Sequence, residues 1–240
     1  GNSNTAATDF TWTYDTTAPT VSSITFADAA LKAGDTSLVT IVFSEAVTAF
    51  ANADLTIVGG TMTAVSSANS GVTWTSTFTP TADLEDDTNV LIVADSYTDI
   101  AGNAGSAGLT SGNYEIDTLL PVLTIGITSD NSNGATLAMS GDTITLTITV
   151  SESVTGLVCT IDGEATASSG SAQSWSSTLE LSGDETEGAL GFSCASHADA
   201  AGNTGATDTS ANTGSVTVDL TDPSVGIGTV AGDGYINEDE

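Results

Sequence analysis

The feature that most constrains this chain is internal repetition. An Asp-x-x-x-Pro segment at residues 15–19 recurs at 117–121 and at 219–223, so its three aspartates are spaced 102 residues apart. Repetition at a fixed period is typical of an array of similar domains. We therefore predict four parts: the last strand of a preceding repeat (residues 1–15), a first repeat (16–117), a second repeat (118–219) and the start of a following repeat (220–240).

Within each repeat, polar and apolar residues alternate with a period of two. Residues 36–43 and 143–150 show this alternation and are rich in Thr, Val and Ile, which suits half-buried β-strands. Gly, Asn and Asp clusters separate such runs, and about seven short strands in 100 residues predict an immunoglobulin-like β-sandwich. The predicted fold is all-β, with tandem sandwiches in an elongated array. In the first repeat we expect strands near residues 20–26, 36–44, 54–58, 61–66, 72–79, 89–96 and 112–117, with Trp74 and its counterpart Trp175 in the cores.

The charge balance excludes several functions. The 240 residues include 31 Asp and Glu but one basic side chain, Lys32, which gives a net charge of -30. Such a polyanion cannot neutralise phosphates, so nucleic acid is excluded as a partner. No apolar run approaches the length of a membrane-spanning helix. The chain has one His and no recognisable nucleophile or paired-His motif, so we expect no enzymatic activity.

Four motifs recur in the same order in both repeats. After Asp-x-x-x-Pro come Gly-Asp-Thr at 34–36 and 141–143, Ser-Glu-x-Val at 44–47 and 151–154, and Asp-x-Ala-Gly-Asn-x-Gly at 99–105 and 199–205. This order resembles the bacterial Ig-like repeats of giant secreted adhesins, which include RTX-type and biofilm-associated surface proteins. The resemblance covers essentially the whole chain. It implies an extracellular array of adjacent repeats on the bacterial cell surface, stiffened by calcium between domains.

The predicted topology gives a separate reason to expect a metal. In the sandwich, the loop after the second strand, the loop before the last strand and the start of the first strand lie at one pole. Ca²⁺ prefers carboxylate, amide and carbonyl oxygens, and clustered carboxylates without a basic partner repel one another. The alternative is an Asx-type turn whose aspartate is merely solvated. The candidate calcium ligands are Asp15, Glu45, Asp99 and Asn103 in the first repeat and Asp117, Glu152, Asp199 and Asn203 in the second.

Three more acidic residues are candidate ligands. Asp83 and Asp86 belong to an acidic run that we expect in a loop at the opposite pole of the first repeat, facing the second repeat. A solvated loop is an equally good interpretation of this run. Asp219 occupies the position of Asp15 at the next junction.

The only two cysteines, Cys159 and Cys194, fall on strands that are neighbours in one sheet of an immunoglobulin-like sandwich. A disulfide between them is geometrically plausible and would indicate an oxidising compartment. Two buried free thiols are the alternative, because the first repeat has neither cysteine. We expect His197, beside the Asp199 turn, to be a surface loop residue.

These features together predict a non-enzymatic structural extender, a calcium-rigidified rod that projects the distal binding domain of a surface adhesin for cell adhesion or biofilm formation. The alternative is a repeat or subunit of an extracellular filament or surface layer. In that case homotypic contacts between chains would form by strand addition.

Overall fold

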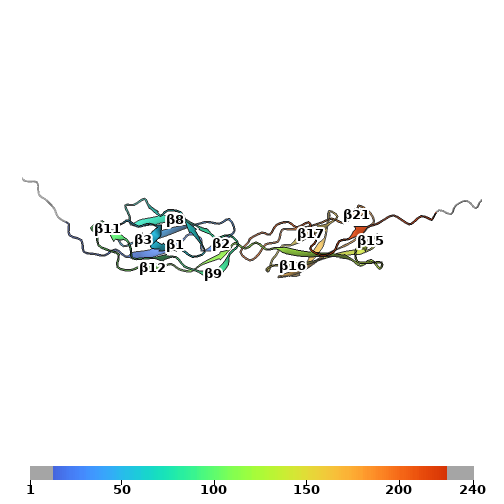
Figure 1. Ribbon diagram of the computed structural model, residues 1–240, viewed down its shortest axis with the longest axis horizontal. Helices are drawn as coiled ribbons and strands as arrows, with labels where there is room; N and C mark the ends of the chain where they lie inside the picture. The colour runs from blue at the N-terminus through green and yellow to red at the C-terminus, as the bar shows by residue number, and fades with distance from the viewer. Residues whose placement is uncertain (1–12, 226–240) are drawn as a thin grey trace, which may run out of the picture. The chain divides into compact units, whose positions relative to one another are not determined.

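The computed structural model describes residues 13–225, which form β-strands, loops and one short 3-10 turn, η1 (Asn52–Asp54). The chain divides into two compact units (Figure 1). Unit 1 comprises Gly1–Val122, Val150–Leu157 and Ser196–Ala206, and unit 2 comprises Leu123–Thr149, Val158–Ala195 and Thr207–Glu240. The all-β immunoglobulin-like fold predicted from the alternating pattern is confirmed.

In unit 1 the larger sheet pairs strands that are far apart in sequence. The long central strand β3 (Ser37–Phe43) is antiparallel to β8 (Thr73–Pro80), with Ile41 opposite Trp74. The other members are β1 (Val21–Phe26), which pairs with β3, and β6 (Gly60–Met62) and β7 (Ser66–Ser67), which pair with β8.

Shorter strands form the facing layer of unit 1. Here β13 (Tyr114–Asp117) lies between β2 (Ala30–Lys32), to which it is parallel, and β9 (Glu85–Asn89), to which it is antiparallel. The remaining strands are β10 (Ile92–Val93) between β5 (Leu55–Thr56) and β12 (Leu109–Thr110), and the pair β4 (Val47–Thr48) with β11 (Thr98–Asp99).

The core of unit 1 is aromatic. Alternation along β3 turns Val39, Ile41 and Phe43 inward, where each is almost fully buried. The Phe43 ring meets the Tyr97 ring edge to face at 4.7 Å, and at the other end of the sandwich Phe26 stacks on Tyr114 at 4.4 Å. These ring pairs join the two layers and hold their loops in fixed positions.

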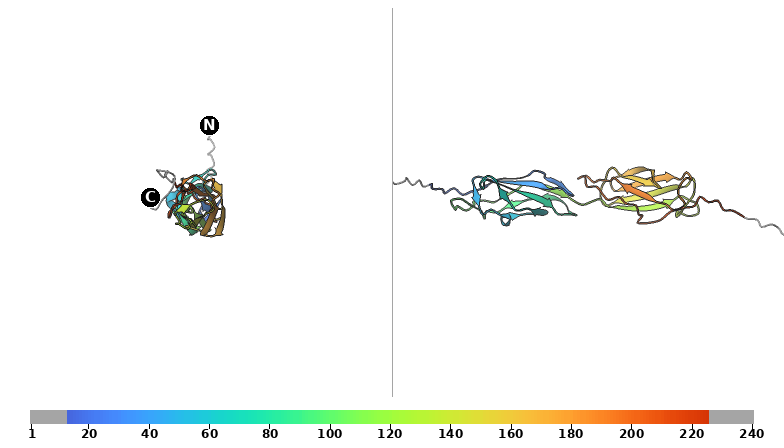
Figure 2. Two further views of the ribbon diagram at one scale, coloured as in Figure 1. Left: turned by 90° about the vertical axis from the view of Figure 1, so that its right-hand side faces the viewer. Right: turned by 90° about the horizontal axis from the view of Figure 1, so that it is seen from above.

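Unit 2 repeats this arrangement with an aliphatic core and a disulfide. Strand β16 (Thr143–Val150) buries Ile144, Leu146 and Ile148 on one face. Cys159 and Cys194 lie opposite each other in the register of β17 and β22, both fully buried, and form a disulfide. Figure 2 shows the strands of each unit running side by side. The strands are β14 (Leu123–Ser129), β15 (Leu137–Ala138), β17 (Val158–Ile161), β18 (Glu164–Ala165), β19 (Ala167–Ser171), β20 (Ser174–Glu180), β21 (Gly188–Ala189), β22 (Phe192–Ala195) and β23 (Thr217–Val218).

The structure differs from the sequence-based expectations in three places. The acidic run predicted as a loop forms strand β9, because Glu85 to Asn89 pair with the edge of β13 while several of their side chains stay in water. Trp74 is half-buried and packs against the core of unit 1, as expected, whereas its counterpart Trp175 is half-buried and lies outside the set of buried core residues. Each tryptophan donates its indole N–H to a nearby turn carbonyl. The third difference, at His197, concerns the candidate site and is described below.

The expected fragments of neighbouring repeats lie mostly outside the described residues. Residues 1–12 and 226–240 are not described, and residues 13–20 contain no strand. The division at residues 15, 117 and 219 therefore stays a prediction. Within residues 13–225, no helix is long and apolar enough to cross a membrane.

Candidate metal sites

Three carboxylates meet at one end of unit 1, and we call them the Asp15 cluster: Asp15, Glu45 and Asp99. One oxygen from each lies within 4.8 Å of the others. Asp15 precedes β1, Glu45 follows β3 and Asp99 ends β11. Pairing of β11 with β4 brings the last two elements together, because Asp99 lies opposite Val47, two residues beyond Glu45.

Asn103 holds this cluster in place. Its backbone N–H donates to Asp99 Oδ1 at 2.7 Å and its side-chain Nδ2 to Asp99 Oδ2, also at 2.7 Å. The same Nδ2 donates to the backbone oxygen of Asp15 at 3.2 Å. Gly102 has φ +95, a conformation that glycine adopts without strain, and this lets the chain turn back within four residues.

Electrostatics separate the roles of the three carboxylates. Burial raises the pKa of Glu45, and the neighbouring charges of Asp15 and Asp99 raise it further. Burial also acts to raise the pKa of Asp99, but hydrogen bonds from Asn103 and from the backbone N–H groups of the loop outweigh burial and lower it. The lowered pKa favours the ionised form of Asp99, whereas the raised pKa of Glu45 reflects its position close to two other negative charges.

A second group with the same arrangement, the Asp117 cluster, consists of Asp117, Glu152 and Asp199. All three lie in unit 1, and one oxygen from each is within 4.8 Å of the others. Asn203 plays the part of Asn103. Its Nδ2 donates to Asp199 Oδ2 at 2.8 Å and to the backbone oxygen of Asp117 at 2.9 Å.

The Asp117 cluster contains buried oxygens without a partner. Among the described residues, Asp117 Oδ1 and Glu152 Oε1 are both buried and accept no hydrogen bond. Burial raises the pKa of Glu152, and the charges of Asp199, Asp117 and Glu85 add to the effect. Burial and Asp199 likewise raise the pKa of Asp117, against a hydrogen bond from Leu119. Unpaired buried carboxylate oxygens are costly, so the donor set fits a hard divalent cation such as Ca²⁺.

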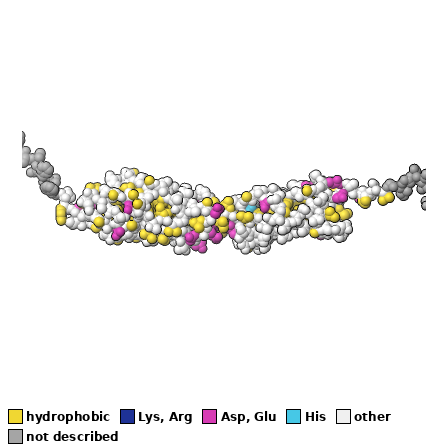
Figure 3. Space-filling view, in the orientation of Figure 1, with side chains coloured by type: hydrophobic (Ala, Val, Ile, Leu, Met, Phe, Trp, Pro, Cys, Tyr) yellow, Lys and Arg dark blue, Asp and Glu magenta, His cyan; other side chains and the backbone are white. Residues whose placement is uncertain are grey.

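Asp83 and Asp86, the two candidate ligands of the acidic run, do not join either carboxylate cluster. Asp83 is exposed and Asp86 accepts a hydrogen bond from Thr88 N–H; neither belongs to a cluster. Their neighbours Glu85 and Asp87 instead raise the pKa of Asp117 by their charge. The register pairs Glu85 with Asp117, a relationship visible from the sequence only if this run is taken as a strand. In Figure 3, acidic side chains gather at the end of unit 1 that carries β2 and β9.

Asp219 is exposed and belongs to no cluster of three in the described part of the chain. It nevertheless has the same local turn as Asp15. Asp219 Oδ1 accepts the N–H of Thr221 at 3.0 Å, and Asp15 Oδ1 accepts that of Thr17 at 2.9 Å. The Asp-x-x-x-Pro segment therefore keeps its conformation at both ends of the described chain.

The expectation that His197 is a surface residue is wrong. Its side chain is fully buried, and neither ring nitrogen has a hydrogen-bond partner among the described residues. His197 stands two residues before Asp199, as the buried Tyr97 stands two residues before Asp99. The second predicted repeat thus has an imidazole where the first has a phenol. Both side chains are buried at this position, before the Asp-x-Ala-Gly-Asn loop.

Three of the solved structures that the chain matches are less than 20% identical to it. The Yersinia pseudotuberculosis adhesin InvE is 17% identical over 82% of this chain, with a TM-score of 0.30. Tandem Ig repeats of Dlar are 11% identical over 86% of this chain and 97% of theirs, with a TM-score of 0.24. A Bacteroides ovatus glucan-utilisation protein, SGBP-B, is 18% identical over 84% of this chain and 46% of its own, with a TM-score of 0.22. This chain spans 58% of the InvE chain.

Sequence comparison points to one family. No curated protein matches the chain. A family model does match, over almost the whole of the first predicted repeat, from Asp15 in the first carboxylate cluster to Ile116 beside the second. The family that residues 15–116 match is the bacterial Ig-like domain.

Proposed function

We propose that this chain is a structural extender segment of a bacterial cell-surface adhesin, in which calcium stiffens an array of Ig-like repeats. The array would hold a distal binding domain away from the cell for adhesion or biofilm formation. The observation that carries the proposal is the recurrence of one carboxylate arrangement, at Asp15 and again at Asp117, the aspartates that begin two Asp-x-x-x-Pro segments.

The position of the clusters suggests what the ion does. Each combines the aspartate that begins an Asp-x-x-x-Pro segment with a glutamate that follows a long strand and the aspartate of an Asp-x-Ala-Gly-Asn motif. A cation bound by all three would tie these three parts of the chain together. Without it the carboxylates repel one another, and the single basic side chain of the sequence cannot neutralise 31 acidic ones. Calcium would therefore change stiffness and stability together.

Two observations support the extracellular part of the proposal. Residues 15–116 match the bacterial Ig-like domain family, and the disulfide between Cys159 and Cys194 suits an oxidising compartment. The proposed role is non-enzymatic, since the chemistry offered by the two clusters is cation binding by oxygen ligands.

Small-angle scattering and calorimetric calcium titration test the proposal. We expect one calcium per cluster, and a change in the maximum dimension of the particle when chelator is added. Glu45→Gln and Glu152→Gln each remove one carboxylate and should each lose one binding event. Glu164→Gln, at an exposed position in β18 of unit 2, is the matched control. The proposal fails if chelator leaves the maximum dimension unchanged and both variants bind as much calcium as the control.

A further inference from the structure

Lys32, the single Lys of a sequence without Arg, lies beside the Asp117 cluster. It ends β2, which is parallel to β13, and the register places Lys32 opposite Asp117 and Leu31 opposite Ile116. Leu31 and Ile116 are buried in the core, and successive side chains of a strand point to opposite faces. Lys32 and Asp117 therefore share the outer face of this layer, on strands about 4.8 Å apart.

The side chain of Lys32 reaches the loop that carries Asp199. A Cβ at Gly202 would lie 3.3 Å from Lys32 Nζ, and Gly202 N–H donates to Asp199 Oδ1 at 2.7 Å. The next residue, Ala33, donates its N–H to Asn203 Oδ1 at 2.8 Å. No ion pair joins Lys32 to a carboxylate of the described chain, so its charge acts on the cluster from a short distance.

Asp117 thus has charges of opposite sign on its two neighbouring strands. Lys32 lies opposite it on β2, and Glu85 lies opposite it on β9. Opposite charges across a sheet attract each other, and like charges repel. Asp117 Oδ1 and Glu152 Oε1 accept no hydrogen bond from the described residues, so the ionised groups around them strongly influence the free energy of the empty cluster.

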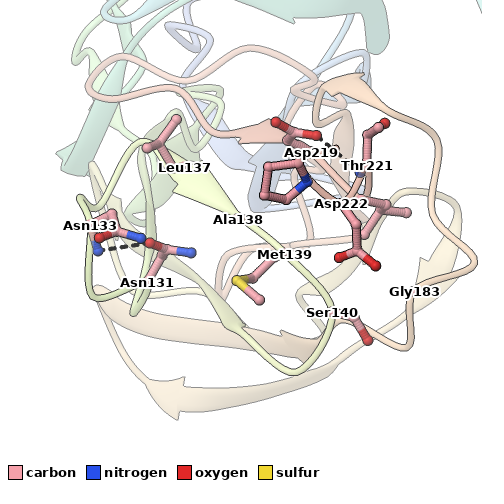
Figure 4. A pocket seen from close by; sticks show the side chains of 12 residues that line it. Asn131, Asn133, Leu137, Ala138, Met139, Ser140, Gly183, Asp219, Thr221 and Asp222 are labelled. Atoms are coloured by element: carbon pink, nitrogen blue, oxygen red, sulfur yellow. Dashed lines mark hydrogen bonds between the residues drawn. The ribbon is translucent and has the colours of Figure 1, made fainter. Parts of the chain in front are cut away.

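The turn that follows Lys32 recurs in unit 2 without the charge. Lys32 N–H donates to Asp35 Oδ2 at 3.2 Å, and Met139 N–H donates to Asp142 Oδ2 at 2.8 Å. The return bond from each aspartate N–H to the carbonyl three residues earlier is 3.1 Å in both turns. Met139 therefore occupies the position of Lys32, and it lines a pocket of about 570 Å³ together with Asp222 (Figure 4). The turn itself does not require an ammonium group.

We propose that Lys32 sets the calcium affinity of the Asp117 cluster. Its ammonium group attracts the carboxylates when the cluster is empty and repels the cation that binds there, so calcium binds less tightly than the carboxylates alone would allow. An ammonium has no acceptor atom, so Lys32 tunes the site and is not a ligand. This inference rests on the proposed calcium role and deepens it, because it names the residue that regulates one site.

Calorimetric calcium titration of the full chain tests the inference, in a Glu45→Gln background that leaves the Asp117 cluster as the remaining site. Lys32→Met removes the charge and supplies the side chain found at the same turn in unit 2. We expect about threefold to tenfold tighter calcium binding, the order of effect that a nearby unit charge has on a divalent ion. Lys32→Arg keeps the charge and should bind like the background chain.

The outcomes separate the two proposals. If Lys32→Met and the background chain bind calcium with equal affinity, the inference about Lys32 is overturned and the calcium role stands. If the background chain binds no calcium, both are overturned. Glu85→Gln, on the other side of Asp117, removes a charge of the opposite sign and should weaken calcium binding. Sodium chloride should reduce both differences, because salt screens charges that are exposed to water.

Thermal melts distinguish this electrostatic role from packing of the Lys32 side chain on Gly202. In chelator the ammonium attracts the carboxylates, so Lys32→Met should melt at a lower temperature than the unmodified chain. In saturating calcium that difference should vanish or change sign, because tighter binding stabilises the variant more. An equal loss of melting temperature in chelator and in calcium would show that Lys32 acts by packing alone, and would overturn the inference.

Discussion

The side-chain amide of Asn203 donates a hydrogen bond to the backbone oxygen of Asp117, 2.9 Å away, although 86 residues separate them in sequence. The same Nδ2 donates to the carboxylate of Asp199 at 2.8 Å. Asn103 joins Asp15 and Asp99 in the same way. In each cluster, one asparagine thus links a backbone carbonyl to a carboxylate by hydrogen bonds that do not require a cation.

Replacing this asparagine should loosen the cluster. Asn203→Ala removes the side-chain donor to the Asp117 carbonyl and to Oδ2 of the buried Asp199, at a cost of about 1–3 kcal/mol for each unsatisfied group. Asp199 Oδ1 keeps its two backbone donors. We expect a lower melting temperature and weaker calcium binding, measured by calorimetry. Asn133→Ala is the control, because Asn133 is exposed and only its backbone N–H makes a hydrogen bond. Equal melting temperatures for the two variants would contradict this role.

The pH dependence of the melting temperature in chelator follows from the raised pKa values of two carboxylates. The folded-state pKa values of Glu152 and Asp117 lie above the reference values of 4.5 and 3.8, because of burial and neighbouring charges. Their contribution to stability is fully present below those reference values and is lost as pH rises through the raised folded pKa values. We therefore expect the melting temperature in chelator to fall from pH 4 to pH 7.

Calcium should reverse this slope, because it binds the ionised carboxylates. Thermal melts at a series of pH values, with calcium and with chelator, measure both slopes. Glu152→Gln should flatten the fall seen in chelator, whereas Glu164→Gln should leave it unchanged. A melting temperature in chelator that rises between pH 4 and pH 7 would contradict the raised pKa values.

Removing the disulfide should affect one unit only. The bond closes a loop of 35 residues in unit 2, and the chain-entropy model assigns such a loop roughly 3–4 kcal/mol. Replacing Cys159 and Cys194 together by Ala should cost at least that much, since both side chains are fully buried. Hydrogen exchange should accelerate in β16 and stay unchanged in β3 of unit 1, which serves as the internal control. Equal acceleration in both strands would show that the two units unfold together.

Two glycines of unit 1 offer a matched test of packing. A Cβ at Gly105 would lie 2.7 Å from the Tyr97 ring, whereas one at Gly112 would meet nothing within 4 Å. Neither glycine needs a positive φ. Gly105→Ala should therefore destabilise unit 1 by about 1–3 kcal/mol, and Gly112→Ala should be close to neutral. Urea denaturation of both variants measures the difference.

The sequence predicted the strands of the sandwich well because β-branched alternation is a local signal. It also predicted that Glu45 and Asp99 lie at the same pole, and the fold brings the two carboxylates together, although Asp99 ends the short strand β11. Whether a loop residue is buried depends on partners distant in sequence, and the wrong predictions concern such residues. His197 was assigned to the surface because a lone imidazole in a polar stretch carries no periodic signal, yet the loop folds it inward like Tyr97. Strand β9 was missed because four acidic or polar residues have low β-propensity, and only pairing with β13 stabilises it.

The disulfide that joins β17 to β22 has a mechanical consequence. If tension unfolded both units, unit 1 could extend to its full contour length. In unit 2 the disulfide would carry the load, so the segment between Cys159 and Cys194 could not extend. With a separation of 35 residues and an extended reach of about 3.4 Å per residue, roughly 120 Å of slack would stay locked. Two sandwiches of the same fold would thus yield unequal lengths of tether under the same load.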